Sequence, residues 1–399
     1  MAKLKREKIV PHLKQKKVLA LYRAAGKVFS IQDFIKKFSS TLAPHERVTI
    51  AESLKLFPAQ GSRLFAHPLT SNPGIGISRE RSSAIAIGSR SAFITKRHIK
   101  LKGCRPIPDL HFPHEQLDFG AQEMLTQKIQ FGSLTAENTM REILAFCFFK
   151  KHGIRVLHAP VAVFEYVFKN RSLGFCLVSL SPTETRLEAD EDYFGLSIAD
   201  LLSIRLVEKE LGVKSSLPAE VGFKGVGQWW YANEKGKLLV SMNFNGGFRG
   251  ILNSNLGNDL VHQRKLYICD FDTFRVLKMP TKPSEKFICG FCLWSIIELL
   301  KSSPFILEYA DTRKLAQSRI SAELWSIYKK NSSLWQSYHG YFFAEVRKRG
   351  WSVQKFEKAI EHVASSKVFS EMILDNLLNP KLLAETYKPE LSFYVPQFM

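Results

Sequence analysis

The chain has few cysteines and no long uninterrupted apolar run, and these two shortages exclude several classes of protein. Its 399 residues include only six cysteines without regular spacing, which argues against a disulfide-stabilised secreted domain and indicates a reducing compartment. We therefore expect a cytoplasmic protein. The most apolar segment, residues 287–307, contains glutamate, lysine and proline, so it predicts a buried helix that ends before Pro304 and no membrane span.

Acidic residues are also scarce relative to basic ones. Fifty-seven lysines and arginines against 37 acids leave a net charge of +20, which favours an acidic protein, a nucleotide or a nucleic acid as partner. The first 27 residues hold nine basic residues and one acid, but they lack the apolar core of a secretory signal. They favour a basic amphipathic helix. No zinc-finger, RRM-type or clear helix-turn-helix motif accompanies the charge.

Strand patterns gather in the first half of the chain and helix patterns in the second. Strands are predicted at residues 83–88, 98–103, 156–168 and 172–180, and a helix between a cap at Thr135 and a stop at Gly153. Residues 28–58 favour helix and loop, residues 225–236 a loop, and residues 284–378 mostly helix. We expect an α+β fold with a basic helical extension over 1–60, a sheet-rich lobe over 61–185 and a helical lobe with the catalytic loop over 186–399.

Residues 266–274 hold the most informative pattern. Four apolar residues run into Asp270, and alternation along an extended strand predicts that Asp272 shares its face. Asn258 and Asp259 lie upstream in a turn-rich loop. A loop with amide or acid side chains, a short strand and Asp-Phe is how kinase-like folds hold magnesium on nucleotide phosphates. The alternative is a hairpin whose polar residues only serve its turns.

Two further residues complete a nucleotide-site pattern in chain order. Lys102 lies on a predicted strand and Glu142 on the following helix, before the loop and Asp270. In such sites the lysine neutralises phosphate, the glutamate orients the lysine, and the acids hold the metal. A single strand lysine is more often solvated and a single helix glutamate more often on the surface, so only the order and intervals predict an Mg-ATP site.

Four short segments in this same order resemble the selenoprotein O family. They are residues 83–104 around Lys102, residues 141–161 beginning with Arg-Glu, residues 177–186 ending at Arg186, and residues 250–255. The resemblance is distant and extends over residues 74–275. It implies a bilobed protein-kinase-like fold, with a small sheet-rich N-lobe and a larger helical C-lobe.

The resemblance also implies an activity and roles for residues. The family transfers AMP from ATP, bound in an inverted orientation, to hydroxyl side chains of protein substrates. By position, Lys102 would bind phosphate, Glu142 would hold Lys102, Arg186 would be a further phosphate-binding residue, and Asp270 would bind the metal. These assignments are expectations carried over from the family.

The chain departs from the family in its catalytic loop. Leu256 stands where the family has a metal-binding asparagine, so either the loop is degraded or it is longer and Asn258 or Asp259 supplies the ligand. We favour the second option, which makes Asn258, Asp259, Asp270 and Asp272 the predicted metal ligands. Asn253 is a poor general base, which weakens ordinary phosphoryl transfer and leaves Asp259 as the candidate base.

Three other functions therefore stay open: a protein or small-molecule kinase, an ATP-binding pseudoenzyme, and a basic module that binds nucleic acid or protein. The pair Cys289 and Cys292 has the spacing of a redox motif, but it lies in an apolar helical segment and favours buried thiols. The aromatic run 229–231 favours core or partner contact over stacking on adenine.

Overall fold

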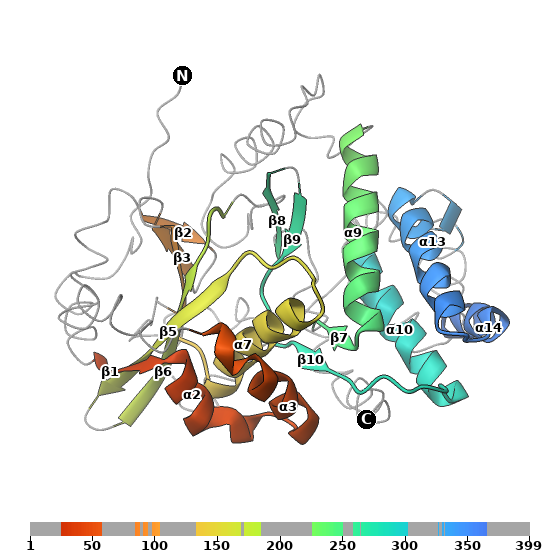
Figure 1. Cartoon of the computed structure of the whole chain (residues 1–399). Helices are drawn as coiled ribbons and strands as arrows, with labels where there is room; N and C mark the ends of the chain where they lie inside the picture. The colour runs from red at the N-terminus through yellow and green to blue at the C-terminus, as the bar shows by residue number, and fades with distance from the viewer. Residues whose placement is uncertain are drawn as a thin grey trace, which may run out of the picture. The chain divides into compact units, whose positions relative to one another are not determined.

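The computed structural model describes residues 25–57, 84–87, 91–94, 98–103, 133–168, 171–184, 226–249, 258–263, 265–301, 326, 329–330 and 332–364. Seven α-helices and small antiparallel sheets lie within these ranges, which confirms the predicted α+β class (Figure 1). The chain divides into two compact units. Unit 1 comprises Met1–Thr185, Asp190–Ser197 and Cys269–Phe274, and unit 2 comprises Arg186–Ala189, Ile198–Ile268 and Arg275–Met399.

Unit 1 contains a six-stranded antiparallel sheet in the order β1-β5-β6-β4-β3-β2. Its strands are β1 Ala25–Ser30, β2 Ala84–Ile87, β3 Ser91–Ile94, β4 Ile99–Lys102, β5 Ala159–Phe168 and β6 Arg171–Leu180. Four of these were predicted, whereas β1 and β3 were missed. β1 has only two large apolar residues, Val28 and Phe29, and they are adjacent, so it lacks the alternation that predicts a strand, and β3 has only four residues.

Three helices of unit 1 begin at side-chain caps or proline. These are α2 Ile31–Phe38, α3 Pro44–Ser53 and α7 Ala136–Lys151, with the 3-10 turns η1 Ser39–Thr41 and η2 Leu54–Leu56 after α2 and α3. As predicted, the Thr135 hydroxyl accepts a hydrogen bond from the N–H of Asn138 at 2.9 Å and begins α7. Gly153 ends it in a left-handed conformation, with φ +63°.

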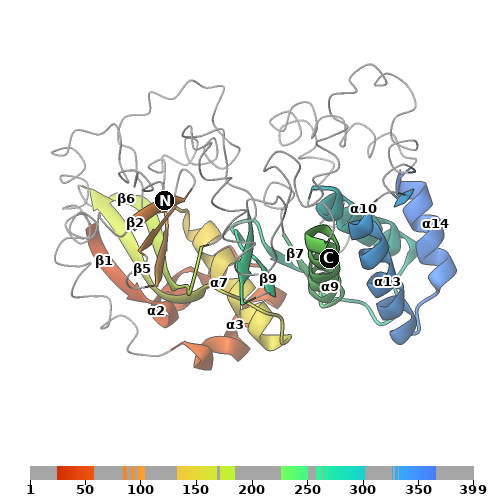
Figure 2. The same ribbon diagram turned by 90° about the horizontal axis from the view of Figure 1, so that it is seen from above.

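Helices α2 and α7 cover the same face of the sheet (Figure 2). Phe175 of β6 packs against Phe34 of α2, with ring centroids 5.2 Å apart. Leu177 follows Phe175 by two residues on β6 and lies opposite Lys102 of β4. The side chain of Lys102 contacts Glu142 of α7. Side chains two residues apart on a strand share a face, so Lys102 points toward α7.

Unit 2 is mainly helical. It contains α9 Val226–Phe244, β7 Gly247–Phe248, β8 Asp259–His262, β9 Lys265–Ile268, β10 Arg275–Val276, α10 Glu285–Lys301, α13 Ser333–Lys348 and α14 Val353–Ala364. β8 and β9 form an antiparallel hairpin, and β10 pairs with β7. As predicted, α10 ends before Pro304.

The predicted loop over residues 225–236 is wrong, because α9 runs through it. Its glycines suggested a break, but Tyr231, Leu238 and Met242 are buried along the helix. Gly236 has a packing reason: a Cβ there would lie 3.0 Å from the backbone nitrogen of Tyr338 on α13. Close helix packing therefore overrides the weak local propensity of glycine.

Aromatic residues form the core between the helices of unit 2. Phe291 of α10 contacts Phe244 of α9 at 5.1 Å and Phe342 of α13 at 5.9 Å between ring centroids. Trp351 stacks on Phe356 of α14 at 5.5 Å with an interplanar angle of 3°. These contacts bury a large apolar area and fix the helices of this unit to one another.

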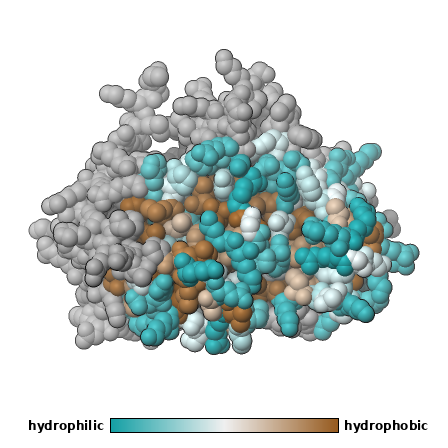
Figure 3. Space-filling model, viewed as in Figure 1, coloured by the Kyte–Doolittle hydropathy of each residue, from teal (hydrophilic) through white to brown (hydrophobic). Residues whose placement is uncertain are grey.

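The surface of the described residues is mixed in polarity. On the face drawn in Figure 3, hydrophobic side chains are visible among hydrophilic ones. Four large hydrophobic residues in the described part of the chain are exposed, namely Val48, Leu54, Leu56 and Leu180. Within the same part of the chain, no helix is both long and apolar enough to cross a membrane.

Replacing Gly103 by alanine should destabilise the protein more than replacing Gly153. Both residues have a positive φ, +84° and +63°, which costs a non-glycine residue about 1–2 kcal/mol. A Cβ at Gly103 would also lie 2.4 Å from the backbone oxygen of Phe175, whereas at Gly153 it would meet nothing within 4 Å. We expect urea unfolding to give a loss of about 1 kcal/mol for Gly153→Ala and at least about 3 kcal/mol for Gly103→Ala. Equal losses would contradict this close packing of β4 against β6.

Candidate functional site

Lys102 is a buried lysine surrounded by three carboxylates. Its Nζ is in contact with Oε1 of Glu142 and Oδ1 of Asp270, and it lies 3.6 Å from Oδ2 of Asp272. All four residues belong to unit 1. A buried ammonium group is costly without charged partners, so these carboxylates stabilise Lys102 at the end of β4. The structure thus brings together four of the residues that the sequence pattern singled out.

Glu142 links Lys102 to the segment that follows β9. Its Oε1 contacts Lys102 Nζ and also accepts a hydrogen bond from the backbone N–H of Phe271 at 2.7 Å. The side chain of Glu142 is 8% exposed. A carboxylate in this position accepts hydrogen bonds from a side chain and a main chain at once, and it orients both.

Aromatic contacts hold the same segment against α7. The ring of Phe271 lies edge-on to Phe149 at 5.0 Å, and Phe274 contacts Phe148 at 5.3 Å and Phe149 at 5.9 Å. Phe148, Phe149 and Phe274 are fully buried. Apolar packing therefore fixes the backbone on either side of Asp272, while Glu142 fixes it at Phe271.

The expected geometry of Asp270 and Asp272 is wrong, although both reach Lys102. β9 ends at Ile268, and Asp270 is in the left-handed region with φ +64°, a conformation that aspartate tolerates better than most residues. Asp272 lies in the turn that follows. The Asp270 side chain is 22% exposed and that of Asp272 only 5%, so Asp270 is the more accessible carboxylate to a ligand.

A second buried lysine lies two residues earlier on β4. Nζ of Lys100 is 3.2 Å from Oε2 of Glu184, and the other oxygen of Glu184 is 2.5 Å from Nε2 of His158. Burial lowers the pKa of His158, the charge of Lys100 lowers it further, and Glu184 opposes both. The sequence reasoning missed both partners: His158 lies on the predicted strand 156–168 but gives no local signal of a partner, and Glu184 lies beyond the strand predicted at 172–180.

Asp259 belongs to unit 2 and forms a buried ion pair there. Its Oδ1 and Oδ2 lie 2.5 and 2.7 Å from Nζ of Lys235, and the hydroxyl of Tyr231 donates to Oδ2 at 2.8 Å. Lys235 and Asp259 have no exposed side-chain surface. Burial lowers the pKa of Lys235 to about 8, although Asp259 opposes the shift. The sequence reasoning missed Lys235 and Tyr231 because it placed a loop where α9 lies.

The remaining predicted residues fall in two groups. Asn258 is buried next to Asp259 in unit 2, and Arg186 lies outside the described residues. The metal roles predicted for Asn258 and Asp259 therefore stay predictions. Cys289 and Cys292 lie on α10, as predicted; Cys292 is buried, whereas Cys289 is only partly buried.

Asp270 and Asp272 are the residues beside Lys102 that could hold a metal ion. Among the residues that the structure describes, no three or more His, Cys, Asp and Glu side chains form a metal-binding group. Magnesium, however, usually binds one or two carboxylates together with substrate phosphates and water. Asp270 and Asp272, which both approach Lys102, supply that kind of donor set.

Comparisons with family models, with curated proteins and with solved structures find no match to this chain. The resemblance to the selenoprotein O family therefore stays a prediction from the short segments described above.

Replacing Lys235 by methionine should strongly destabilise unit 2. The substitution leaves the carboxylate of Asp259 buried without its cation, which costs about 3–5 kcal/mol. In the double variant Lys235→Met/Asp259→Leu no charge is left behind, so we expect most of the stability to return in urea unfolding. A double variant as unstable as the single one would mean that the pair is not the source of the loss.

Proposed function

We propose that this protein binds Mg-ATP through Lys102 and transfers a nucleotidyl group to protein hydroxyl side chains. A bilobed protein-kinase-like fold, with the sheet of unit 1 in its smaller lobe, is part of this proposal. The observation that supports it best is the contact of one lysine with a helix glutamate and with an aspartate two residues after β9, from distant segments. Kinase-like sites require the lysine–glutamate ion pair together with an aspartate that binds the metal.

The contacts of Lys102 support a site that changes partners when a ligand binds. Lys102 contacts Glu142 and Asp270, with Asp272 at 3.6 Å. Asp270 and Asp272 are suited to release Lys102 in favour of a divalent cation, because carboxylate oxygens are the preferred ligands of magnesium. Lys102 would then donate to a phosphate oxygen, and Glu142 would keep its orientation through the N–H of Phe271.

The residues of the proposed site have separate roles. Lys102 neutralises phosphate charge, Glu142 orients Lys102, and Asp270 and Asp272 hold the cation. Magnesium, when bound, stabilises the negative charge that develops on the transferred group. Arg186 is proposed as a further phosphate-binding residue on the strength of the family resemblance alone.

The preference for AMP transfer over phosphate transfer depends on the resemblance and on the catalytic loop. Asn253 stands where a protein kinase would need a carboxylate, and an asparagine cannot accept the proton of an acceptor hydroxyl. A transfer that relies on the metal and on positioning tolerates that loss better.

An ATP-binding pseudoenzyme is the second candidate, and one contact favours it. Asp259, the nearest candidate base in sequence, is fully buried and is held by Lys235 and Tyr231. A carboxylate held in this way cannot act as a general base unless it leaves both partners. Nucleotide would then serve as a structural or regulatory ligand.

Mg-ATP should stabilise the native protein against thermal unfolding. At a ligand concentration of 100 Kd the gain is about 2.7 kcal/mol, and it should disappear in Lys102→Met and Asp270→Asn. Lys265→Met removes an exposed lysine from β9 and should keep the full shift. No shift of the unaltered protein with Mg-ATP would contradict the proposed binding.

ATP labelled at different phosphates separates the candidate reactions. With an acceptor protein and magnesium, AMP transfer should leave the α label on protein and release the γ label. Retention of the γ label would identify a kinase, and retention of neither label, together with Mg-ATP binding, would identify the pseudoenzyme. Asp270→Asn provides the background for both measurements.

A further inference from the structure

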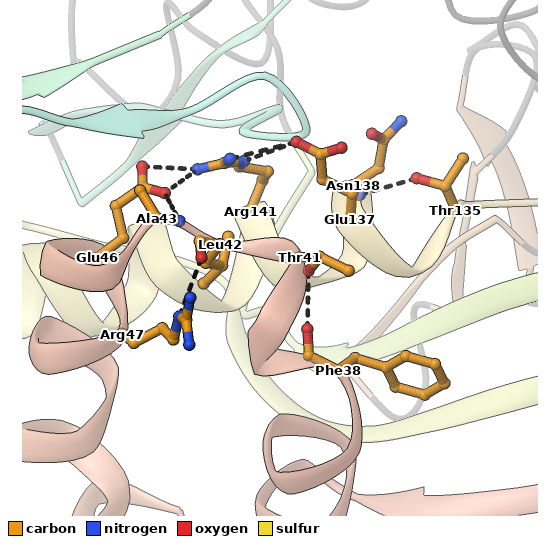
Figure 4. A network of polar contacts seen from close by, with 10 residues as sticks. All are labelled: Phe38, Thr41, Leu42, Ala43, Glu46, Arg47, Thr135, Glu137, Asn138 and Arg141. Carbon is orange, nitrogen blue, oxygen red and sulfur yellow. Dashed lines mark hydrogen bonds and ion pairs between the residues drawn. The ribbon is translucent and has the colours of Figure 1, made fainter.

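Helix α3 is joined to α7 by a buried ion pair (Figure 4), whose Arg141 is the neighbour in sequence of Glu142 in the candidate site. Nη1 of Arg141 on α7 donates to both carboxylate oxygens of Glu46 on α3, at 2.6 Å each. The side chain of Glu46 has no exposed surface, and that of Arg141 is 5% exposed. Short hydrogen bonds between opposite buried charges are strong and geometrically demanding.

Both ends of this pair are themselves fixed. Oε2 of Glu46 also accepts from the backbone N–H of Ala43 at 3.0 Å, which closes the first turn of α3. Nη2 and Nε of Arg141 donate to Oε1 of Glu137, one helical turn earlier, at 3.2 and 3.4 Å. The guanidinium group therefore has one position relative to α3 and α7.

Arg141 immediately precedes Glu142 on α7. Successive residues on an α-helix point about 100° apart, so Arg141 reaches α3 while Glu142 reaches Lys102 and the N–H of Phe271. Every residue of α7 from Asn138 to Phe149 is buried, which leaves the helix little freedom to move one side chain without the other.

We infer that Glu46 and Arg141 are positioning residues for the Lys102 site. Their ion pair holds α7 in the position from which Glu142 contacts both Lys102 and the backbone N–H of Phe271. Helix α3 then affects the site without contributing a residue to it, because it fixes the position of α7. The effect on nucleotide binding rests on the proposed function, whereas the effect on the Phe271 N–H does not.

The experiment compares two identical substitutions on α3. Glu46→Gln removes the buried charge but keeps an oxygen that can accept from Ala43, so α3 keeps its first turn. Glu52→Gln removes a second α3–α7 ion pair, in which Glu52 is 2.6 Å from Lys151 and both side chains are largely exposed, at 51% and 40%. The two variants thus change charge equally on the same helix.

Hydrogen exchange of the Phe271 amide reports the position of Glu142 without any ligand. We expect Glu46→Gln to speed this exchange at least tenfold and to leave the amides of α9 in unit 2 unchanged. Glu52→Gln should change the exchange of Phe271 less than twofold. In Mg-ATP titrations, the apparent Kd should rise at least tenfold for Glu46→Gln and stay within twofold for Glu52→Gln.

The outcomes separate this inference from the proposed function. Unaltered exchange of Phe271 in Glu46→Gln would overturn the inference, even if Mg-ATP binds. Absence of Mg-ATP binding in the unaltered protein would refute the proposed function, while the exchange result would still decide the inference. Should Glu46→Gln fail to fold, Arg141→Lys keeps the charge and loses the two-oxygen contact. It should then give intermediate exchange of Phe271, and exchange equal to that of the unaltered protein would overturn the inference.

Discussion

Burial of the Lys102 ammonium group is the constraint on which the arrangement of unit 1 depends. A lysine that is nearly out of solvent must have carboxylates around it, and here they come from α7 and from the segment after β9. Those two segments are far apart in the chain and close in unit 1. The electrostatic requirement of one side chain therefore brings together the end of β4, the middle of α7 and the Asp270 turn.

Another buried lysine, Lys235, also needs a carboxylate partner, but its surroundings differ from those of Lys102. In unit 2, Lys235 and Asp259 are completely buried and satisfy each other together with Tyr231. Around Lys102 the carboxylates outnumber the lysine, and Asp270 keeps 22% of its side chain exposed. A closed pair suits structural stabilisation, whereas an accessible carboxylate beside a shared lysine suits exchange with a charged ligand.

Local sequence signals predicted the elements that begin and end at capping residues or glycine. Helix α7 was predicted from Thr135 and Gly153, and both residues form its ends. β1 was missed because its two large apolar residues, Val28 and Phe29, are adjacent and do not alternate with polar ones. α9 was mistaken for a loop because Gly236 is required by its close packing on α13 rather than by a turn.

The sequence predicted which residues meet around Lys102 better than it predicted how they are arranged. Chain order was enough to connect Lys102, Glu142 and Asp270, since kinase-like sites require these residue types in this order. The positive φ of Asp270 could not be foreseen, because the residue follows an ordinary strand pattern. The partners of Asp259 could not be foreseen either, because Lys235 was expected in a loop, where its burial has no local signal.

A crystal structure with magnesium and a non-hydrolysable ATP analogue would show whether Lys102 binds phosphate. We expect a metal ion in contact with the Asp270 carboxylate and a phosphate oxygen in contact with Nζ of Lys102, while Glu142 stays in contact with Lys102 and with the N–H of Phe271. An analogue bound elsewhere, with Lys102 still held by Asp270 and Asp272, would contradict this expectation.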